Sequence, residues 1–317
     1  MGVDNVDVPA ATQRGVLVVN SPEGNTIAAA EHALAMLLSV SRHVPQAHGS
    51  MRSGAWDRKK YVGNELYKKI LGVVGLGKIG SHVARVAKAM GMEVIAFDPF
   101  ISTERAQQMQ VRLTTLEALF QQDDYITLHI PRTPDTENLV NAELLRTMKS
   151  TARIVNCARG GIVDEPAIAE AIESGVIAGA GLDVFASEPL AQDSPLRAVE
   201  RGLVLTPHLG ASTEEAQENV AVDVAEQIRD VLLGLPARSA VNIPGLSAEI
   251  MERLKPHLQL AETLGLLVSQ LSGGQVQELE VRLQGEFASH PSQPLVVAAL
   301  KGLLSTCLLY TSPSPRD

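Results

Sequence analysis

A glycine-rich turn between two apolar runs constrains this chain more than any other feature. A run rich in Val and Ile ends in the pattern Gly75-x-Gly77-x-x-Gly80. A stripe of apolar residues at helical spacing follows, and a second apolar run then ends at Asp98. Strand, glycine turn, helix, strand and acid, in this order, are typical of a dinucleotide-binding βαβ unit.

Each glycine of this pattern has its own expected role. Gly75 makes the tight turn, Gly77 lets the backbone approach a pyrophosphate, and Gly80 lets the helix pack closely on the strand. The N–H groups at the start of the helix direct partial positive charge toward the phosphates. Asp98 would accept hydrogen bonds from ribose hydroxyls and repel a 2′-phosphate, which predicts NAD rather than NADP. A structural turn in another α/β protein is the alternative, because a lone GxGxxG pattern is a weak signal.

Length, charge and cysteine content exclude several classes of protein. The 317 residues suffice for two or more domains, and a net charge of −9 argues against a nucleic-acid partner. No segment approaches the ~20 uninterrupted apolar residues of a membrane span, and no secretory signal is visible. Cys157 and Cys307 are too few for a disulfide framework, and no metal-ligand spacing such as H-E-x-x-H occurs. We therefore expect a cytoplasmic, reduced protein without a metal.

Strand-like and helical runs alternate through most of the chain. The expected strands lie at 16–19, 70–74, 94–97, 125–130, 152–156, 177–184 and 202–206. The expected helices lie at 26–43, 81–90, 115–122, 141–148, 166–174 and 213–233. This alternation predicts an α/β fold, a doubly wound parallel sheet of the Rossmann type with helices on both faces. Ser212 and Glu215 can form a capping box for the last helix, which Gly234 and Pro236 would end.

The sequence changes character after a linker at 238–245. We expect a helix at 249–271, a strand at 276–283 and a helix at 295–304, which together would open a further α/β domain. Residues 306–317 continue neither pattern. We interpret them as a disordered, foreign-looking tail.

Chemically capable side chains follow the ends of the expected parallel strands. Ligands of open parallel sheets bind beyond the carboxyl ends of the strands. Arg159 follows the strand at 152–156, Glu188 lies five residues after Asp183, and His208 follows the strand at 202–206. We therefore expect Arg159, Glu188 and His208 to converge beside the nicotinamide.

These three side-chain types suit the oxidation of a 2-hydroxy acid. A histidine titrates near neutral pH, so it can take the hydroxyl proton and return it in the reverse reaction. A carboxylate on the other ring nitrogen would fix the tautomer and favour the imidazolium form. An arginine can hold the substrate carboxylate and polarise the carbonyl. Taken singly, His208, Arg159 and Glu188 have ordinary structural explanations, and their joint placement at successive strand ends favours one site.

Longer motifs extend the pattern over nearly the whole chain. They are Gly2-Val-Asp-Asn-Val-Asp7, Gly54-Ala-Trp-Asp-Arg58, Asn156-Cys-Ala-Arg-Gly-Gly-Ile-Val-Asp-Glu165, Leu182-Asp-Val-Phe185, Glu188-Pro189 and Pro207-His-Leu-Gly-Ala-Ser-Thr213. With these motifs the chain resembles the D-isomer-specific 2-hydroxyacid dehydrogenases. Within that family it is most similar to the long-form branch that oxidises 3-phosphoglycerate with NAD in serine biosynthesis.

The resemblance implies a role for each matching residue. Arg159 would bind and polarise the substrate, Glu188 would pair with His208, and His208 would act as acid and base. The family's dinucleotide contacts fall on the glycine turn and on seven further residues: Lys78 and Ile79 for the pyrophosphate, Asp98 for the ribose, Asp183 for the nicotinamide carboxamide, and Ile130, Cys157 and Ala158 along the dinucleotide. The helix after Pro22 and the loop at Trp56 would build a two-fold homodimer, and a basic cluster, Arg58-Lys59-Lys60, could reach the neighbouring subunit's substrate.

The resemblance also implies a domain division. Residues 1–21 would be a remnant of a flavodoxin-like substrate domain, 22–208 the NAD-binding domain and 209–236 the return helix of the substrate domain. Residues 237–305 would start an intervening domain, followed by the tail at 306–317. Because family members carry further segments at both ends, we expect a fragment that binds NAD, with turnover by the fragment in doubt.

Two alternative functions stay open at this point. One is a reductase for glyoxylate, hydroxypyruvate or another small 2-oxo acid, because the motifs at the site do not separate these substrates. The C-terminal extension favours phosphoglycerate, since short family members lack it. The other is a non-catalytic NAD-sensing protein on the same scaffold, which the linker into a further α/β domain disfavours.

Overall fold

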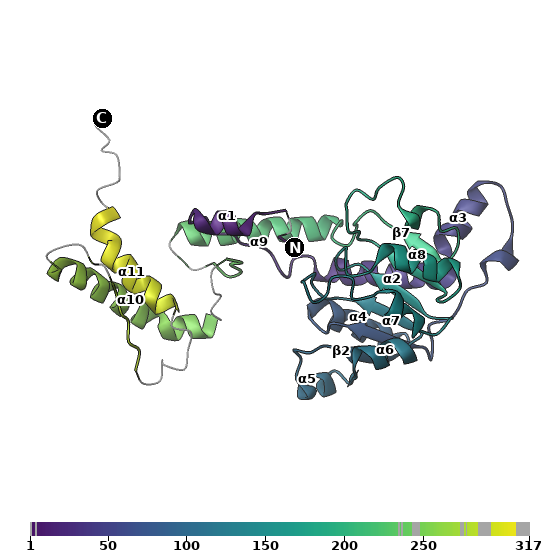
Figure 1. Cartoon of the computed structure of the whole chain (residues 1–317), viewed down its shortest axis with the longest axis horizontal. Coiled ribbons are helices and arrows are strands. Elements are labelled where there is room, and N and C mark those ends of the chain that lie inside the picture. Colours follow the sequence, from purple (N-terminus) through teal and green to yellow (C-terminus); the bar gives the residue numbers. More distant parts are fainter. Residues whose placement is uncertain are drawn as a thin grey trace. The chain divides into compact units, whose positions relative to one another are not determined.

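The computed structural model describes residues 2–3, 5–233, 235, 237–242, 248–272, 276, 278–284 and 293–308 (Figure 1). They divide into two compact units. The first comprises residues 21–223, and the second comprises residues 2–20 and those from 224 onward. Among the described residues, no helix has the length and apolar character needed to cross a membrane.

A parallel seven-stranded sheet forms the first unit, in the order β3-β2-β1-β4-β5-β6-β7. The strands are β1 (Ile70–Val74), β2 (Glu93–Phe97), β3 (Arg112–Leu113), β4 (Tyr125–Leu128), β5 (Arg153–Asn156), β6 (Gly179–Leu182) and β7 (Leu203–Leu205). Their last residues are in register: Val74 pairs with Leu128, Leu128 with Asn156, and Asn156 with Leu182. The loops that leave these strands therefore start from one edge of the sheet.

Helices cover both faces of this sheet. The helices of the first unit are α2 (Thr26–Arg42), α3 (Val44–Arg52), α4 (Lys78–Ala89), α5 (Thr103–Gln108), α6 (Leu116–Gln122), α7 (Ala142–Arg146) and α8 (Glu165–Glu173), with the 3-10 turns η1 (Arg58–Tyr61) and η2 (Pro195–Arg197). Neighbouring strand residues point to opposite faces, so Val73 joins a core with α2 and α4, whereas Val74 joins a core with α6, α7 and α8. The sheet is thus buried on both sides, as its continuous apolar strands require.

Short polar residues fix where several of these helices begin. The side chain of Asp164 accepts a hydrogen bond from the N–H of Ala167 at 3.1 Å, and Thr115 and Asn141 cap α6 and α7 in the same way. Gly175, with φ +75°, follows the end of α8. These are the stop and start signals that made the α/β alternation readable from the sequence.

The predicted α/β fold with a doubly wound parallel sheet is confirmed, and the corrections are local. Four helices or strands were missed, namely α1 (Val8–Gln13), α3, α5 and the two-residue strand β3, together with the 3-10 turns η1 and η2. The capping-box prediction for the helix α9 (Glu214–Leu232) was wrong, because the hydroxyl of Thr213, not Ser212, accepts from the N–H of Ala216 at 3.1 Å. The predicted terminators Gly234 and Pro236 lie outside the described residues.

The second unit contains α1 (Val8–Gln13), the last turns of α9, α10 (Ala248–Leu271) and α11 (Gln293–Leu308). The helices α10 and α11 cross where each carries a glycine. A Cβ on Gly265 would overlap the carbonyl oxygen of Ala299, and one on Gly302 would overlap that of Glu262. The two helix backbones therefore touch almost directly.

Three expectations for this unit need correction. The strand predicted at 16–19 is reduced to a single bridge between Val19 and Ala240. Within the described chain it has no neighbouring strand with which it could form a ladder. The described residues of the segment at 276–283 are extended without a strand partner. The tail predicted from residue 306 overlaps α11, which runs to Leu308, and residues 309–317 lie outside the described chain.

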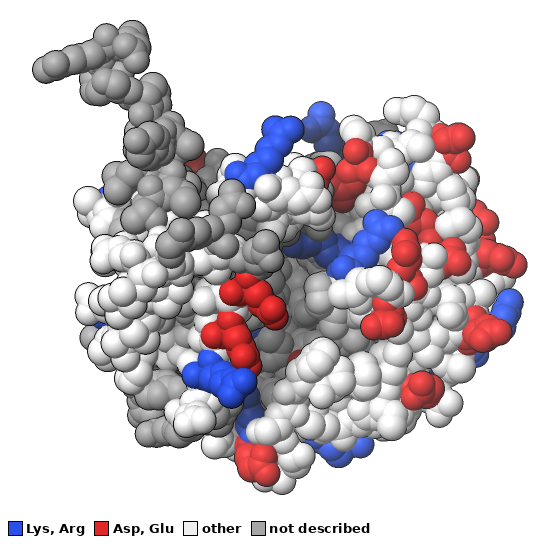
Figure 2. Space-filling model, turned by 60° about the vertical axis from the view of Figure 1, so that its left-hand side comes forward, with Lys and Arg blue, Asp and Glu red and all other residues white. Residues whose placement is uncertain are grey.

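Charged groups of both signs are mixed on the surface. On the face drawn in Figure 2, basic side chains lie among more widely spread acidic ones. This agrees with the net charge of −9.

Candidate active site

The glycine turn joins β1 to α4 with the geometry that the three glycines predict. Gly75 has φ +95°, and a Cβ there would lie 2.6 Å from the carbonyl oxygen of His129. A Cβ on Gly80 would overlap the carbonyl oxygen of Gly75, so the helix can pack here only without a side chain. Around Gly77, in contrast, a Cβ would meet no atom within 4 Å. The backbone at Gly77 is therefore open to a ligand, as a dinucleotide phosphate requires.

Two charged side chains border this turn. Asp98 accepts hydrogen bonds from the N–H of Leu76 at 2.8 Å and from the N–H of Phe100 at 2.8 Å, one on each carboxylate oxygen. Since each oxygen can accept a second bond, the half-buried carboxylate retains capacity for ribose hydroxyls. Lys78 opens α4 and forms an ion pair with Glu23, and Ile79 follows it in the first helical turn. The site residues predicted for the adenosine and pyrophosphate therefore surround one turn.

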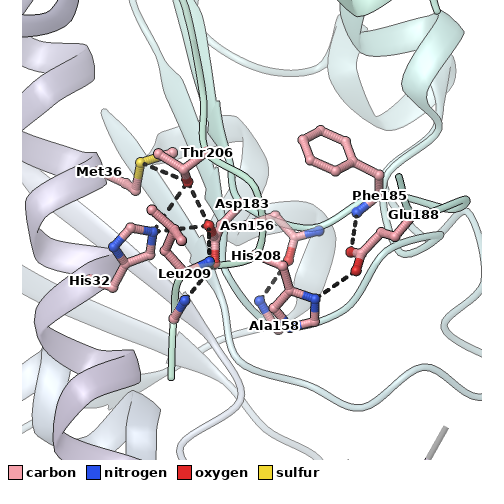
Figure 3. Close-up of polar contacts among 11 residues, drawn as sticks. His32, Met36, Asn156, Ala158, Asp183, Phe185, Glu188, Thr206, His208 and Leu209 are labelled. Atoms are coloured by element: carbon pink, nitrogen blue, oxygen red, sulfur yellow. Dashed lines mark hydrogen bonds and ion pairs between the residues drawn. The ribbon is translucent and has the colours of Figure 1, made fainter. Parts of the chain in front are cut away.

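His208 and Glu188 form a hydrogen-bonded pair at the carboxyl edge of the sheet. The Nδ1 of His208 lies 2.7 Å from Oε2 of Glu188, and Oε1 of Glu188 accepts from the N–H of Phe185 at 3.0 Å (Figure 3). The carboxylate can only accept, so Nδ1 carries the proton and Nε2 is left for proton exchange. The side chains are 49% and 36% exposed, so the pair is accessible from solvent.

The same pair lines a cavity of about 570 Å³. Its wall combines these two polar groups with apolar side chains, among them Phe185, Leu190 and Leu205. The mixture of apolar surface with a few polar groups is usual for small-molecule sites.

Arg159 lies on the loop after β5, and the side chain of Asn156 clamps that loop. The Nδ2 of Asn156 donates to the carbonyl oxygen of Arg159 at 2.9 Å, and the Oδ1 of Asn156 accepts from the N–H of Ala158 at 3.0 Å. A Cβ on Gly160 would overlap the carbonyl oxygen of Phe185. The backbone next to Arg159 is therefore packed directly against the segment that leads to Glu188.

A second polar network, centred on Asp183, supports the His208 loop. The side chain of Asp183 is fully buried. Its Oδ1 accepts from the hydroxyl of Thr206 at 2.5 Å and the N–H of Leu209 at 2.8 Å, while Oδ2 accepts from the N–H of Gly210 at 2.9 Å (Figure 3). His208 itself donates its N–H to the backbone carbonyl of Asp183 at 2.8 Å. The loop is thus fixed on both sides of His208, whose φ is +55°.

His32 on α2 completes this network. Its Nε2 lies 3.1 Å from Oδ1 of Asp183 and 3.2 Å from Oγ1 of Thr206. Burial alone would raise the pKa of Asp183, but hydrogen bonds from His32, Thr206 and the Leu209 N–H outweigh it and lower the pKa. The sequence predicts only a cofactor contact for Asp183 and does not predict the contributions of His32 and Thr206. The available signal was a histidine on the apolar stripe of α2, between Ala29 and Met36.

The set His32, Cys157 and Asp183 also needs a test as a metal centre. One potential ligand atom from each lies within 4.8 Å of the others. However, Asp183 is occupied by protein donors, and burial raises the pKa of the Cys157 thiol far above its usual range, with the charge of Asp183 adding to the effect. A metal would need the thiolate, so hydrogen bonding explains this cluster better than ligation.

The residues after β4 face the glycine turn. A Cβ on Gly75 would lie 2.9 Å from Cγ2 of Ile130, which places Ile130 next to the expected dinucleotide. Burial lowers the pKa of His129 to about 4. His129 is therefore neutral near pH 7 and a poor acid, which leaves His208 as the better candidate at this edge.

Comparison with known proteins identifies the scaffold. Residues 34–210 match the family model described as "D-isomer specific 2-hydroxyacid dehydrogenase, NAD binding domain". The chain belongs to the D-isomer-specific 2-hydroxyacid dehydrogenase family. Residues 253–311 match a second family model, "D-3-phosphoglycerate dehydrogenase intervening domain". Residues 34–210, which match the NAD-binding domain, include the glycine turn, Asp98 and the His208–Glu188 pair.

A named relative covers nearly the whole chain. The chain is 66% identical over 309 residues to D-3-phosphoglycerate dehydrogenase of Synechocystis sp., spanning 97% of this chain and 55% of that protein. It spans 58% of the Bacillus subtilis enzyme of the same name. The chain thus corresponds to somewhat over half the length of these relatives.

Solved structures share the fold of this chain. The TT0316 protein from Thermus thermophilus superposes with a TM-score of 0.70 at 38% identity, covering 76% of both chains. D-lactate dehydrogenase from Aquifex aeolicus, solved with NAD and lactic acid, gives a TM-score of 0.69 at 28% identity over 77% of this chain and 78% of that one.

Proposed function

We propose that this protein oxidises 3-phospho-D-glycerate to 3-phosphohydroxypyruvate with NAD, the first step of serine biosynthesis. The observation that carries the proposal is the 2.7 Å contact between His208 and Glu188, on the same sheet edge as the open glycine turn. The choice of substrate is supported by the relatives named D-3-phosphoglycerate dehydrogenase and by the match to an intervening domain of that enzyme.

In this proposal His208 removes the hydroxyl proton of the substrate through Nε2. Glu188 keeps Nδ1 protonated and lies close enough to stabilise the imidazolium that results. When bound, NAD would accept the hydride that leaves the carbon bearing this hydroxyl group. In the reverse direction His208 returns the proton to the carbonyl oxygen.

Arg159 is proposed to hold the substrate carboxylate and polarise the reacting carbonyl. Its planar guanidinium suits two parallel bonds to a carboxylate. The packing of its loop against Phe185 supports a position near Glu188. The basic cluster Arg58-Lys59-Lys60 is proposed, on the resemblance alone, to contact the phosphate of a substrate in a neighbouring subunit.

We propose that NAD occupies the site through Gly75, Gly77, Lys78, Ile79, Gly80 and Asp98, and through Ile130, Cys157, Ala158 and Asp183 further along. The open backbone at Gly77 and the acceptor capacity of Asp98 support the first group. For Asp183 the support is weaker, because its side chain is fully buried and already accepts several protein donors. Its role in holding the His208 loop is the better supported one.

We also propose the domain division given by the sequence, a homodimer and a cytoplasmic location. Several large apolar side chains in and after α3 are exposed: Val44, Met51, Trp56 and Val62 are 53%, 51%, 75% and 75% exposed. Such a surface is expected to be covered by a second copy. The location is based on the small number of cysteines.

The decisive experiment is an NADH-formation assay on the intact, full-length protein, with excess NAD and a hydrazine trap for the keto product. We expect NADH with 3-phosphoglycerate and much less with glycolate or D-lactate. A preference for glycolate or D-lactate would favour the alternative 2-hydroxyacid reductase. NAD binding with no turnover of any of the three substrates would favour the NAD-sensing alternative.

A further inference from the structure

A cavity of about 730 Å³ between α4 and α5 is lined by one kind of charge. It contains Lys78, Arg85, Lys88, Arg105 and the titratable His82, and none of its lining residues is acidic. The chain as a whole carries nine more acidic than basic side chains. A cavity with only basic groups is therefore not a sample of the average surface.

The sequence of α4 concentrates these cations on one side of the helix. Lys78, His82, Arg85 and Lys88 follow one another at spacings of three or four residues, which places them on one face. The helix contains no acidic residue to compensate them. Lys78 also lies in the first turn, where the helix dipole disfavours positive charge. The helix therefore carries an electrostatic cost that a bound anion would relieve.

Protein groups leave most of this charge uncompensated. Arg85 contacts His82, with Nη2 3.2 Å from Nδ1, and Lys88 donates to the carbonyl oxygen of Met109 at 3.0 Å. Within the described chain, neither of them nor Arg105 forms an ion pair with a carboxylate. Lys78 differs, because it pairs with Glu23.

Some basic residues elsewhere in the first unit form ion pairs with acidic side chains. Arg112 pairs with Glu93, Arg132 with Glu137, and Lys149 with Asp124. Ion pairs therefore do form in this unit, but among the cations that line the cavity only Lys78 has one within the described chain.

We propose that this cavity is a binding site for a small polyanion, a molecule with two or more phosphate or carboxylate groups. Its volume lies within the ~300–1,000 Å³ typical of small-molecule sites. Lys88 is held in place by backbone carbonyls, so its charge is fixed toward the cavity without being neutralised. Lys78 borders both the cavity and the dinucleotide turn, but Arg85 lies two helical turns beyond Gly77 and Arg105 belongs to α5, so most of the cavity lies away from that turn. The proposal is independent of the reaction proposed above.

Calorimetric titration of the full chain with inorganic tripolyphosphate and, separately, with citrate tests the site. We expect one equivalent of at least one anion to bind, equally well with and without saturating NAD, and more weakly as ionic strength rises. The double change Arg85→Gln and Arg105→Gln should weaken binding at least tenfold. The anion that binds more tightly, tripolyphosphate or citrate, shows whether the site prefers phosphate or carboxylate groups.

Two control variants make the result decisive. Arg146→Gln removes an exposed arginine on α7, on the other face of the sheet, and should leave binding unchanged. Arg105→Lys retains the charge and should retain most of the affinity, with thermal melts confirming that each variant is folded. The proposal is overturned if neither anion binds, if the double variant binds like the parent, or if NAD competes with the anion.

Discussion

Two fully buried aspartates lie at opposite edges of the same parallel sheet, and their pKa values are shifted in opposite directions. Asp183 follows β6 at the carboxyl edge, and its oxygens accept from Thr206, Leu209 and Gly210. Asp123 precedes β4 at the amino edge, and neither of its oxygens has a hydrogen-bond partner. The pKa of Asp183 is lowered, whereas burial raises the pKa of Asp123 to about 8 despite the nearby positive charge of Lys149.

The comparison shows that partners, not burial, decide whether a buried carboxyl is charged. At the carboxyl edge an ionised group organises the loop that carries His208. At the amino edge a neutral group fills space beside Gly72, where a Cβ would overlap Oδ2 of Asp123. A buried aspartate therefore organises a loop at one edge of the sheet and fills space at the other.

The largest effect should come from His208→Ala in the dehydrogenase assay. Loss of a general acid and base is expected to lower turnover by roughly 10²–10⁴ while NAD affinity stays nearly constant. Because the side chain is half exposed, the melting temperature should hardly change. Unchanged turnover would remove His208 from the mechanism and weaken the assignment of chemistry to this edge.

The change Asp123→Asn should stabilise the protein in a pH-dependent way. Between pH 4 and pH 8 the unfolded chain releases the Asp123 proton while the folded chain retains it, so the free energy of unfolding falls as pH rises. Asparagine removes this loss, and the rise in pKa from 3.8 to about 8 sets an upper limit of about 6 kcal/mol at pH 9.

Urea unfolding of both proteins at pH 4, 6.5 and 9 measures this effect. We expect the two stabilities to be similar at pH 4 and to diverge steadily above it. Equal stabilities at pH 9 would mean that the pKa of Asp123 is not raised by folding and that the contrast with Asp183 is false.

The same substitution at the other edge, Asp183→Asn, should have the opposite sign. The amide would place a donor against the N–H groups of Leu209 and Gly210, which is expected to cost about 2–3 kcal/mol at pH 7. The contribution of Asp183 is present above its unfolded pKa and is lost as pH falls through its depressed folded pKa, so the cost should fade in acid. Urea unfolding at pH 7 and pH 3 checks both statements, with Asp123→Asn as the matched control.

The smallest effect is expected from Asp98→Ala, at the adenosine end of the carboxyl edge. Loss of the ribose acceptor should weaken NAD binding by about tenfold and relax discrimination against NADP. The Leu76 and Phe100 N–H groups lose their acceptor, so a small loss of stability should accompany it. Dissociation constants for both dinucleotides test the prediction, and an unaltered preference would contradict it.

Much of this organisation was predictable because it is local in sequence. The glycine turn, the helix caps and the apolar strands each fall within about a dozen residues, and the positions of Arg159, Glu188 and His208 follow from strand ends. The role of His32 was not predictable, because it depends on a contact across 151 positions to Asp183. The two-residue strand β3 is too short to leave a pattern, and the segment at 276–283 alternates like a strand but has none beside it in the described chain.

The glycines where α10 and α11 cross are positions at which a substitution would perturb the packing of the second unit alone. With Gly265 against Ala299 and Gly302 against Glu262, even one added methyl group must wedge the two helices apart. Alanine at either position would therefore loosen this hairpin by steric force, without changing its charge or polarity. The crossing thus allows the packing of the second unit to be perturbed by steric force alone, independently of any ligand.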